Sequence, residues 1–162
     1  MPDDSAVVTL SRALTTLGEW EARVALTDVT REYFQALADA TTNRDFAKAI
    51  RLMLKAKSQP SRERAAALVV KHSDYPYLHR ALLRTTHAFV IQAAGCKENV
   101  IPSEATTRVN CRGIPGGEKP RDFLAAVRKL LADKEVEVVL AGLVHLLALR
   151  RPHQRGVAEV GL

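Results

Sequence analysis

The chain has 162 residues, of which 47% are hydrophobic and 26% are charged, ordinary values for a single globular domain that exclude a largely disordered chain. No apolar run approaches the roughly 20 residues that a membrane-spanning helix needs. The chain opens Met-Pro-Asp-Asp, which lacks the basic head and apolar core of a signal peptide. We therefore expect a cytoplasmic chain.

The net charge of +6 and the isoelectric point near 9.6 raise nucleic acid as a partner. The basic residues are scattered among acidic ones, and aromatic residues make up only 5% of the chain, so no base-stacking platform is evident. Charged side chains on a solvated surface explain the excess of basic residues better than nucleic-acid binding does. A basic nucleic-acid-binding domain is kept as an alternative.

The first half of the chain is predicted to be helical. Ser5 or the two aspartates before it can cap the first helix, and Gly18 can close it. Pro60 separates the third helix from the fourth, and Pro76 limits any helix beyond that point. Apolar residues at helical spacing predict helices over 5–18, 28–40, 45–57 and 62–71.

After Arg84 the apolar period changes from helical to two. We predict strands over 86–94, 105–112 and 135–140, with a helix that begins at Pro120 between the last two. In the second strand, one face is apolar and small, with Ala105, Thr107, Val109 and Cys111. The other face is polar and cationic, with Thr106, Arg108, Asn110 and Arg112.

Two turns flank this second strand. Asn99-Val100-Ile101-Pro102 precedes it, and Pro115-Gly116-Gly117 follows it. On spacing alone, Asn99 is a turn residue and Arg112 is a solvated strand end.

This combination resembles the lid, or dimerisation, domain of the two-zinc aminoacylase and carboxypeptidase family. That family includes carboxypeptidase S, acetylornithine deacetylase, succinyl-diaminopimelate desuccinylase and glutamate carboxypeptidase. The Asn-x-x-Pro turn, the Val-Asn-Cys-Arg strand end and the following Pro-Gly carry the likeness, which is greatest to the carboxypeptidase S branch. The segments Leu10–Leu14 and Thr27–Ala38 agree with that branch as well.

The resemblance implies an α+β fold, a ferredoxin-like two-layer sandwich of an antiparallel sheet with two helices. The first strand of that fold would precede the first helix and is expected to be missing here. We expect a truncated lid domain over residues 1–142, with a helical block inserted at about 24–84. Residues 143–162 depart from the family pattern. Leu, Pro, His, Gln and Arg recur in this segment and share codons that start with C, so a one-base slip in a C-rich coding stretch would yield such a mixture. We therefore expect a frameshifted or disordered tail, and the alternative is a genuine short amphipathic helix.

The family role of the lid is to grip the substrate and to form a homodimer. By resemblance, Asn99 and Arg112 are predicted substrate-binding residues, because an amide can hydrogen-bond a carbonyl and a guanidinium can bind a carboxylate in a bidentate manner. The substrate would be a peptide or an N-acyl amino acid. Two zinc ions would belong to the catalytic domain of the parent enzyme, so this chain alone is expected to be inactive. A stand-alone self-association module is a second alternative.

We predict no catalytic residue and no metal ligand within this chain. The five histidines show no His-x-Asp signature, and a solvated or capping role is favoured for His72 and His79 over metal binding. Cys96 and Cys111 have no zinc-site spacing and are predicted to be two buried thiols, with pairing across a hairpin as the alternative.

Overall fold

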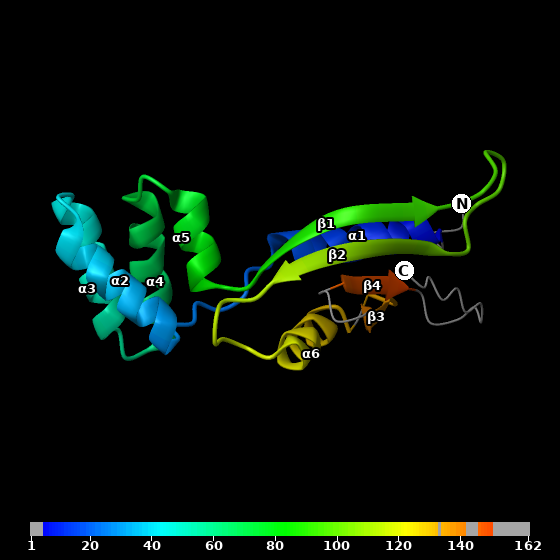
Figure 1. Ribbon diagram of the computed structural model, residues 1–162. Coiled ribbons are helices and arrows are strands. Elements are labelled where there is room, and N and C mark those ends of the chain that lie inside the picture. The colour runs from blue at the N-terminus through cyan, green and yellow to red at the C-terminus, as the bar shows by residue number, and fades with distance from the viewer. Residues whose placement is uncertain (1–4, 133, 142–145, 151–162) are drawn as a thin grey trace. The chain divides into compact units, whose positions relative to one another are not determined.

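The computed structural model describes residues 5–132, 134–141 and 146–150, which contain six helices and four strands (Figure 1). The chain divides into two compact units. The sheet unit takes in the described residues of 1–20, 88–110 and 121–162. The helical unit takes in residues 21–87 and 111–120.

One four-stranded sheet organises the sheet unit, with the strand order β1-β2-β4-β3. β1 and β2 point in opposite directions and are joined by residues 95–104 (Figure 1). β4 pairs antiparallel with β2 on one side and with β3 on the other. The elements are α1 (Ala6–Glu19), β1 (Thr86–Ala94), β2 (Ala105–Arg112), α6 (Pro120–Leu130), β3 (Glu137–Ala141) and β4 (Leu146–Arg150).

The alternation predicted for the second strand is confirmed. Thr107 and Val109 are fully buried, whereas Arg112 is exposed. Across the sheet, Thr107 and Val138 both pair with residue 149, so these two buried side chains lie on the same face. The helices complete this core with their own buried residues: Ala6, Thr9, Leu10, Ala13 and Leu17 of α1, and Phe123, Leu124 and Val127 of α6.

The predicted fold class is therefore confirmed as an α+β, ferredoxin-like sandwich with inserted helices. No strand precedes α1 among the described residues. Within the predicted tail, residues 146–150 form a strand, which neither a disordered segment nor a helix would give. Residues 143–145 and 151–162 lie outside the described residues. Ser5 occupies the N-cap position of α1 without a side-chain bond, and Gly18 lies inside the helix instead of after it.

The helical unit contains α2 (Asp28–Ala40), α3 (Arg44–Lys55), α4 (Gln59–Lys71) and α5 (Pro76–Leu83). Polar residues at their starts accept backbone N–H groups that the helices leave unbonded: Thr27 for α2, Asn43 for α3 and Ser58 for α4. The prediction that Pro76 limits any further helix is wrong, because Pro76 opens α5 and a proline fits the first turn of a helix. The core of the unit comprises Val24, Phe34, Ala38, Phe46, Ala49, Ile50, Met53, Ala65, Ala66, Val69 and Leu83.

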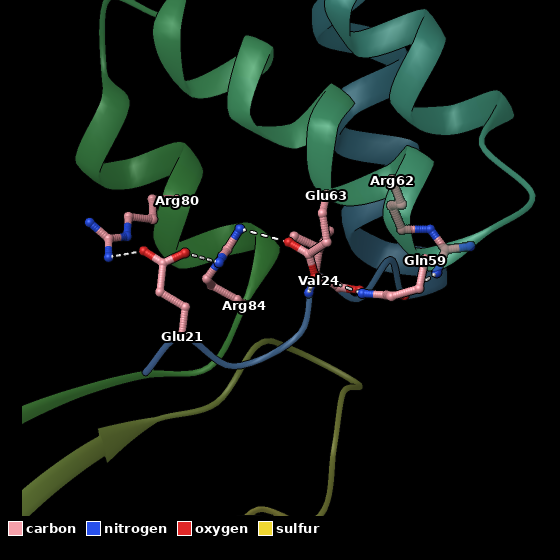
Figure 2. A network of polar contacts seen from close by, with 7 residues as sticks. All are labelled: Glu21, Val24, Gln59, Arg62, Glu63, Arg80 and Arg84. Carbon is pink, nitrogen blue, oxygen red and sulfur yellow. Dashed lines mark hydrogen bonds and ion pairs between the residues drawn. The ribbon is translucent and has the colours of Figure 1, made fainter. Parts of the chain in front are cut away.

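A polar network ties the two ends of the helical block together (Figure 2). Arg84, which follows α5, donates to the carboxylate of Glu21 and, at 3.1 Å, to that of Glu63 on α4. Glu63 also accepts the backbone N–H of Val24 at 2.7 Å. The backbone of residue 25 bonds to the carbonyl of residue 83 at 2.9 Å. The entering and leaving segments of the block are therefore held side by side.

Arg84 is the central residue of this network. Its side chain is only 13% exposed, whereas that of Arg80, which also pairs with Glu21, is 50% exposed. Removal of a largely buried guanidinium between two carboxylates costs more than removal of an exposed one, because the carboxylates lose their donor at a site that solvent screens less. Arg80 and Arg84 therefore form a matched pair for mutation, because both bind Glu21 but only Arg84 is largely buried.

Arg84→Ala is expected to lower the free energy of unfolding by about 2 kcal/mol, because Glu63 and Glu21 lose a charge-assisted donor at a partly buried site. Arg80→Ala should cost less than about 1 kcal/mol. Urea titrations followed by circular dichroism measure both. Equal losses for the two variants would show that Arg84 has no special role in closing the block.

Candidate functional site

Asn99 lies in the turn between β1 and β2. Gly95 begins this connection with a positive φ of 70°, and a side-chain carbon there would lie 3.1 Å from the ring of Pro102. The backbone N–H of Val100 donates to the carbonyl of Lys97 at 3.4 Å, which places Asn99 inside a tight turn. Asn99 is exposed, and among the described residues its side chain makes no hydrogen bond.

A shallow hollow of about 410 Å³ adjoins this turn. Its lining includes Val100, Ile101, Pro102 and Thr106. Val100 and Ile101 are exposed although they are apolar. The Asn99 turn therefore presents an amide beside an apolar surface, an arrangement that suits contact with another molecule.

Arg112 is the last residue of β2 and is exposed, whereas Cys111 before it is buried. Among the described residues, the Arg112 guanidinium makes no hydrogen bond and no ion pair. All its donors are therefore available to a ligand carboxylate.

The backbone after Arg112 is fixed by a type II turn. The N–H of Gly117 donates to the carbonyl of Ile114 at 3.0 Å, Pro115 occupies the second position, and Gly116 has a φ of 68°. Ile114 is buried and anchors the turn. A side-chain carbon at Gly117 would lie 2.3 Å from Ile114, so only glycine fits there. These constraints hold the end of β2 in a defined conformation.

The two predicted site residues lie at opposite ends of β2. Asn99 precedes the strand and belongs to the sheet unit, whereas Arg112 ends the strand and belongs to the helical unit. Their substrate-binding roles remain predictions.

His79 is the most buried ionisable side chain that the sequence analysis considered. It is 3% exposed, so the predicted solvated or capping role is wrong for this residue. Its Nδ1 lies 2.6 Å from the hydroxyl of Ser73, and its Nε2 lies 3.0 Å from the hydroxyl of Tyr33. The rings of Phe34 and Phe46 pack against it. His72 is the C-cap residue of α4, where its backbone N–H bonds to the carbonyls of Leu68 and Val70.

Ser73 and His79 form a hydrogen-bonded pair beside the rings of Phe34 and Phe46. The Ser73 hydroxyl accepts the backbone N–H of Tyr75 at 2.8 Å and shares a second hydrogen bond with Nδ1 of His79, in which either atom can donate. The aromatic rings enclose the imidazole, and burial lowers the pKa of His79. We conclude that His79 closes the core between α2 and α5.

The cysteines differ from each other. Cys111 is buried as predicted, and burial raises the pKa of its thiol to about 11. Cys96 is exposed in the turn before Asn99, so the prediction of a buried thiol is wrong there. No disulfide joins the two.

The described part of the chain contains no group of three histidine, cysteine, aspartate or glutamate side chains that could hold a metal ion. The two zinc ions implied by the family resemblance therefore have no ligand set among these residues. None of the described helices is long and apolar enough to cross a membrane.

Comparison with known proteins decides the family. The model of a family described as the peptidase dimerisation domain matches residues 3–139, which include both Asn99 and Arg112. The chain belongs to the peptidase dimerisation domain family.

The dimerisation domain is also similar to the probable carboxypeptidase S-like 2 of Dictyostelium discoideum. The two are 41% identical over 58 residues, which make up 36% of this chain and 11% of that protein. This agrees with the carboxypeptidase S-like branch that the Asn-x-x-Pro and Val-Asn-Cys-Arg motifs indicate. No solved structure matches the chain significantly.

The buried His79 makes a pH-dependent contribution to the stability of the dimerisation domain. Because its folded pKa is lowered from the ordinary 6.5, the unfolded chain binds more protons just below pH 6.5. The stabilisation is complete above that pH and is lost as the pH falls through the lower folded value. We expect His79→Gln to lose less stability between pH 8 and pH 5 than the wild type, as measured by urea unfolding.

The matched control is His72→Gln, at the half-buried C-cap of α4. This variant should keep the wild-type difference between the two pH values. If His79→Gln also keeps the wild-type difference in unfolding free energy, groups other than His79 cause the loss of stability at acid pH.

Proposed function

We propose that this chain is the lid and dimerisation part of a zinc-dependent peptidase or amidohydrolase that acts on peptides or N-acyl amino acids. The proposal rests on one observation above all, which is the exposed apolar outer strand of a domain in the peptidase dimerisation family. The name of the Dictyostelium relative supports a carboxypeptidase. The zinc ions and the base that activates water would belong to a catalytic domain outside these residues.

The dimer surface in this proposal is centred on β1. β1 is an outer strand of the sheet, and its residues from 88 onward are exposed. Val90 and Ile91 are each 51% exposed on this strand. An outer strand presents backbone N–H and C=O groups that can pair with another strand, and exposed apolar side chains favour such pairing.

The first helix adds to the same surface in the proposal. Val7 and Val8 of α1 are exposed, whereas the opposite side of the helix is buried. A two-fold dimer uses the same patch on both copies, so β1 would meet β1 of a second copy antiparallel. The two sheets would then continue into each other.

Ile91→Lys is expected to raise the dissociation constant of the dimer at least about tenfold, because a charged lysine on an outer strand opposes strand pairing. Sedimentation velocity over a concentration series measures this constant. Val29→Lys in α2, where the side chain is 58% exposed, is the matched control and should leave the dimer unchanged. A wild-type chain that stays monomeric throughout the series would refute the proposed dimer.

Arg112 would hold the substrate carboxylate in the complete enzyme. Its guanidinium is exposed, has no partner among the described residues, and sits at a strand end fixed by the type II turn. A positioned guanidinium loses little entropy when it binds a carboxylate, and exclusion of water strengthens the contact. Asn99 would contribute a hydrogen bond from its exposed turn.

In an enzyme that joins this chain to a catalytic domain of its family, Arg112→Ala should lower kcat/KM by roughly 30- to 900-fold, or about 2–4 kcal/mol. Arg112→Lys should recover only part of this, because an ammonium cannot form the bidentate contact. Thermal unfolding should change little, since Arg112 is exposed. Normal kcat/KM with earlier unfolding would make the arginine structural.

The isolated chain with added zinc should hydrolyse neither peptides nor N-acyl amino acids. Its described residues supply no metal ligand set to activate a water molecule. An assay with a dipeptide and an N-acetyl amino acid tests this. Turnover that co-purifies with the chain and is lost on chelation would overturn the division of roles.

A further inference from the structure

The sheet contains a strand position that the chain order leaves open. β2 and β3 both run antiparallel to β4, so they run parallel to each other. α6 connects them in sequence, as in a β-α-β unit. Adjacent strands of a sheet lie about 4.8 Å apart. β2 and β3 each lie at this spacing from β4, so the space between them is the width of one strand. Without an intervening strand, both would lose a row of backbone hydrogen bonds.

In a ferredoxin-like sheet this middle position belongs to the first strand, which precedes the first helix. Here the position is filled by residues that come last in the described chain. β4 has the direction that the first strand would have, since it is antiparallel to both neighbours. It also lies outside residues 3–139, over which the family model matches.

The sequence of β4 suits a middle strand. Leu146–Arg150 reads Leu-Leu-Ala-Leu-Arg, so no proline removes a backbone donor within it, and Pro152 comes only after it. A middle strand must donate and accept backbone hydrogen bonds on both of its edges, which a proline-free segment can do. Residues 146–149 are paired on both sides at once, with 107–110 of β2 and 138–141 of β3.

We propose that Leu146–Arg150 fills a strand-acceptor site between β2 and β3, the position that the first strand takes in a ferredoxin-like sheet. The site takes one extended, apolar, proline-free peptide segment, antiparallel to both neighbours. In this chain the occupant is its own tail, which is joined to β3 by only four residues, 142–145. Such a short connection gives the tail strand a high effective concentration at the site. The proposal goes beyond the peptidase role and does not depend on it.

The test compares the full chain with a chain that ends at residue 142. Hydrogen–deuterium exchange should show amide protection in residues 107–110 and 138–141 of the full chain and loss of this protection in the shortened chain. The melting temperature of the sheet unit should fall by more than about 5 °C. Residues 28–83 of the helical unit provide an internal control and should keep their protection.

A synthetic peptide of residues 143–152, added to the shortened chain, should restore the lost protection. The same peptide with Ala148→Pro should fail, because proline cannot donate to the ladder, whereas Ala148→Val should succeed. If the shortened chain does not fold, Ala148→Pro and Ala148→Val in the full chain give the same comparison.

Unchanged protection after removal of the tail would overturn the proposal, as would rescue by the proline peptide or the absence of rescue by the wild-type peptide. If the amide protection of residues 107–110 in the full chain depends on chain concentration, the site is filled by the tail of a second copy. That result would overturn the proposal that the chain's own tail fills it. Dimerisation through β1 would alter residues 88–94 instead, so failure of this inference and failure of the proposed function are distinguishable.

Discussion

The sheet unit depends on the strand position between β2 and β3. The pairing of β4 with both neighbours joins the β1–β2 pair to β3 in one sheet. Because that position is filled, the buried face of the sheet is continuous from Thr107 to Val138. The same order makes β1 an outer strand. Val90 and Ile91 are exposed on this strand, and in the proposed function the strand provides the surface through which the domain would pair.

The helical unit is stabilised in a different way. Its apolar core around Phe34, Ile50 and Met53 is closed by polar contacts at the block's two ends, where Arg84 joins Glu21 and Glu63. An inserted block needs its ends close together, and loop closure carries an entropy cost that these contacts offset. Figure 2 shows how Glu63 bonds both to Arg84 and to the backbone of the entering segment.

Much of this architecture follows from local sequence patterns. The alternation along β2 and the helical spacing of α1 to α4 depend on neighbouring residues, and both were predictable. The missed α5 begins at Pro76, where a helix start and a helix barrier look alike in sequence. His79 is held by Tyr33, which is distant in sequence, and by Ser73, which lies before the helix of His79. Neither contact belongs to a helical or strand period that the sequence would reveal. The pairing of β4 is likewise a long-range property that an apolar run cannot specify.

The site was predictable only in part, for a related reason. The strand end at Arg112 and the turn at Asn99 are local features, and both residues are exposed as their surroundings indicate. In the proposed function their ligand would be a substrate of the complete enzyme, whose chemistry the local sequence does not specify. Cys96 was also mispredicted from its residue type alone. Cysteine is generally buried, but Cys96 lies in a polar turn and is exposed.

Concentration-dependent hydrogen–deuterium exchange of β1 tests most directly the claim that this dimerisation domain pairs through its outer strand. The account predicts that amide protection in residues 88–94 rises with chain concentration, while protection in α2, within the helical unit, stays constant. Protection of β1 that is the same at all concentrations would contradict the account, as would an increase confined to the helical unit.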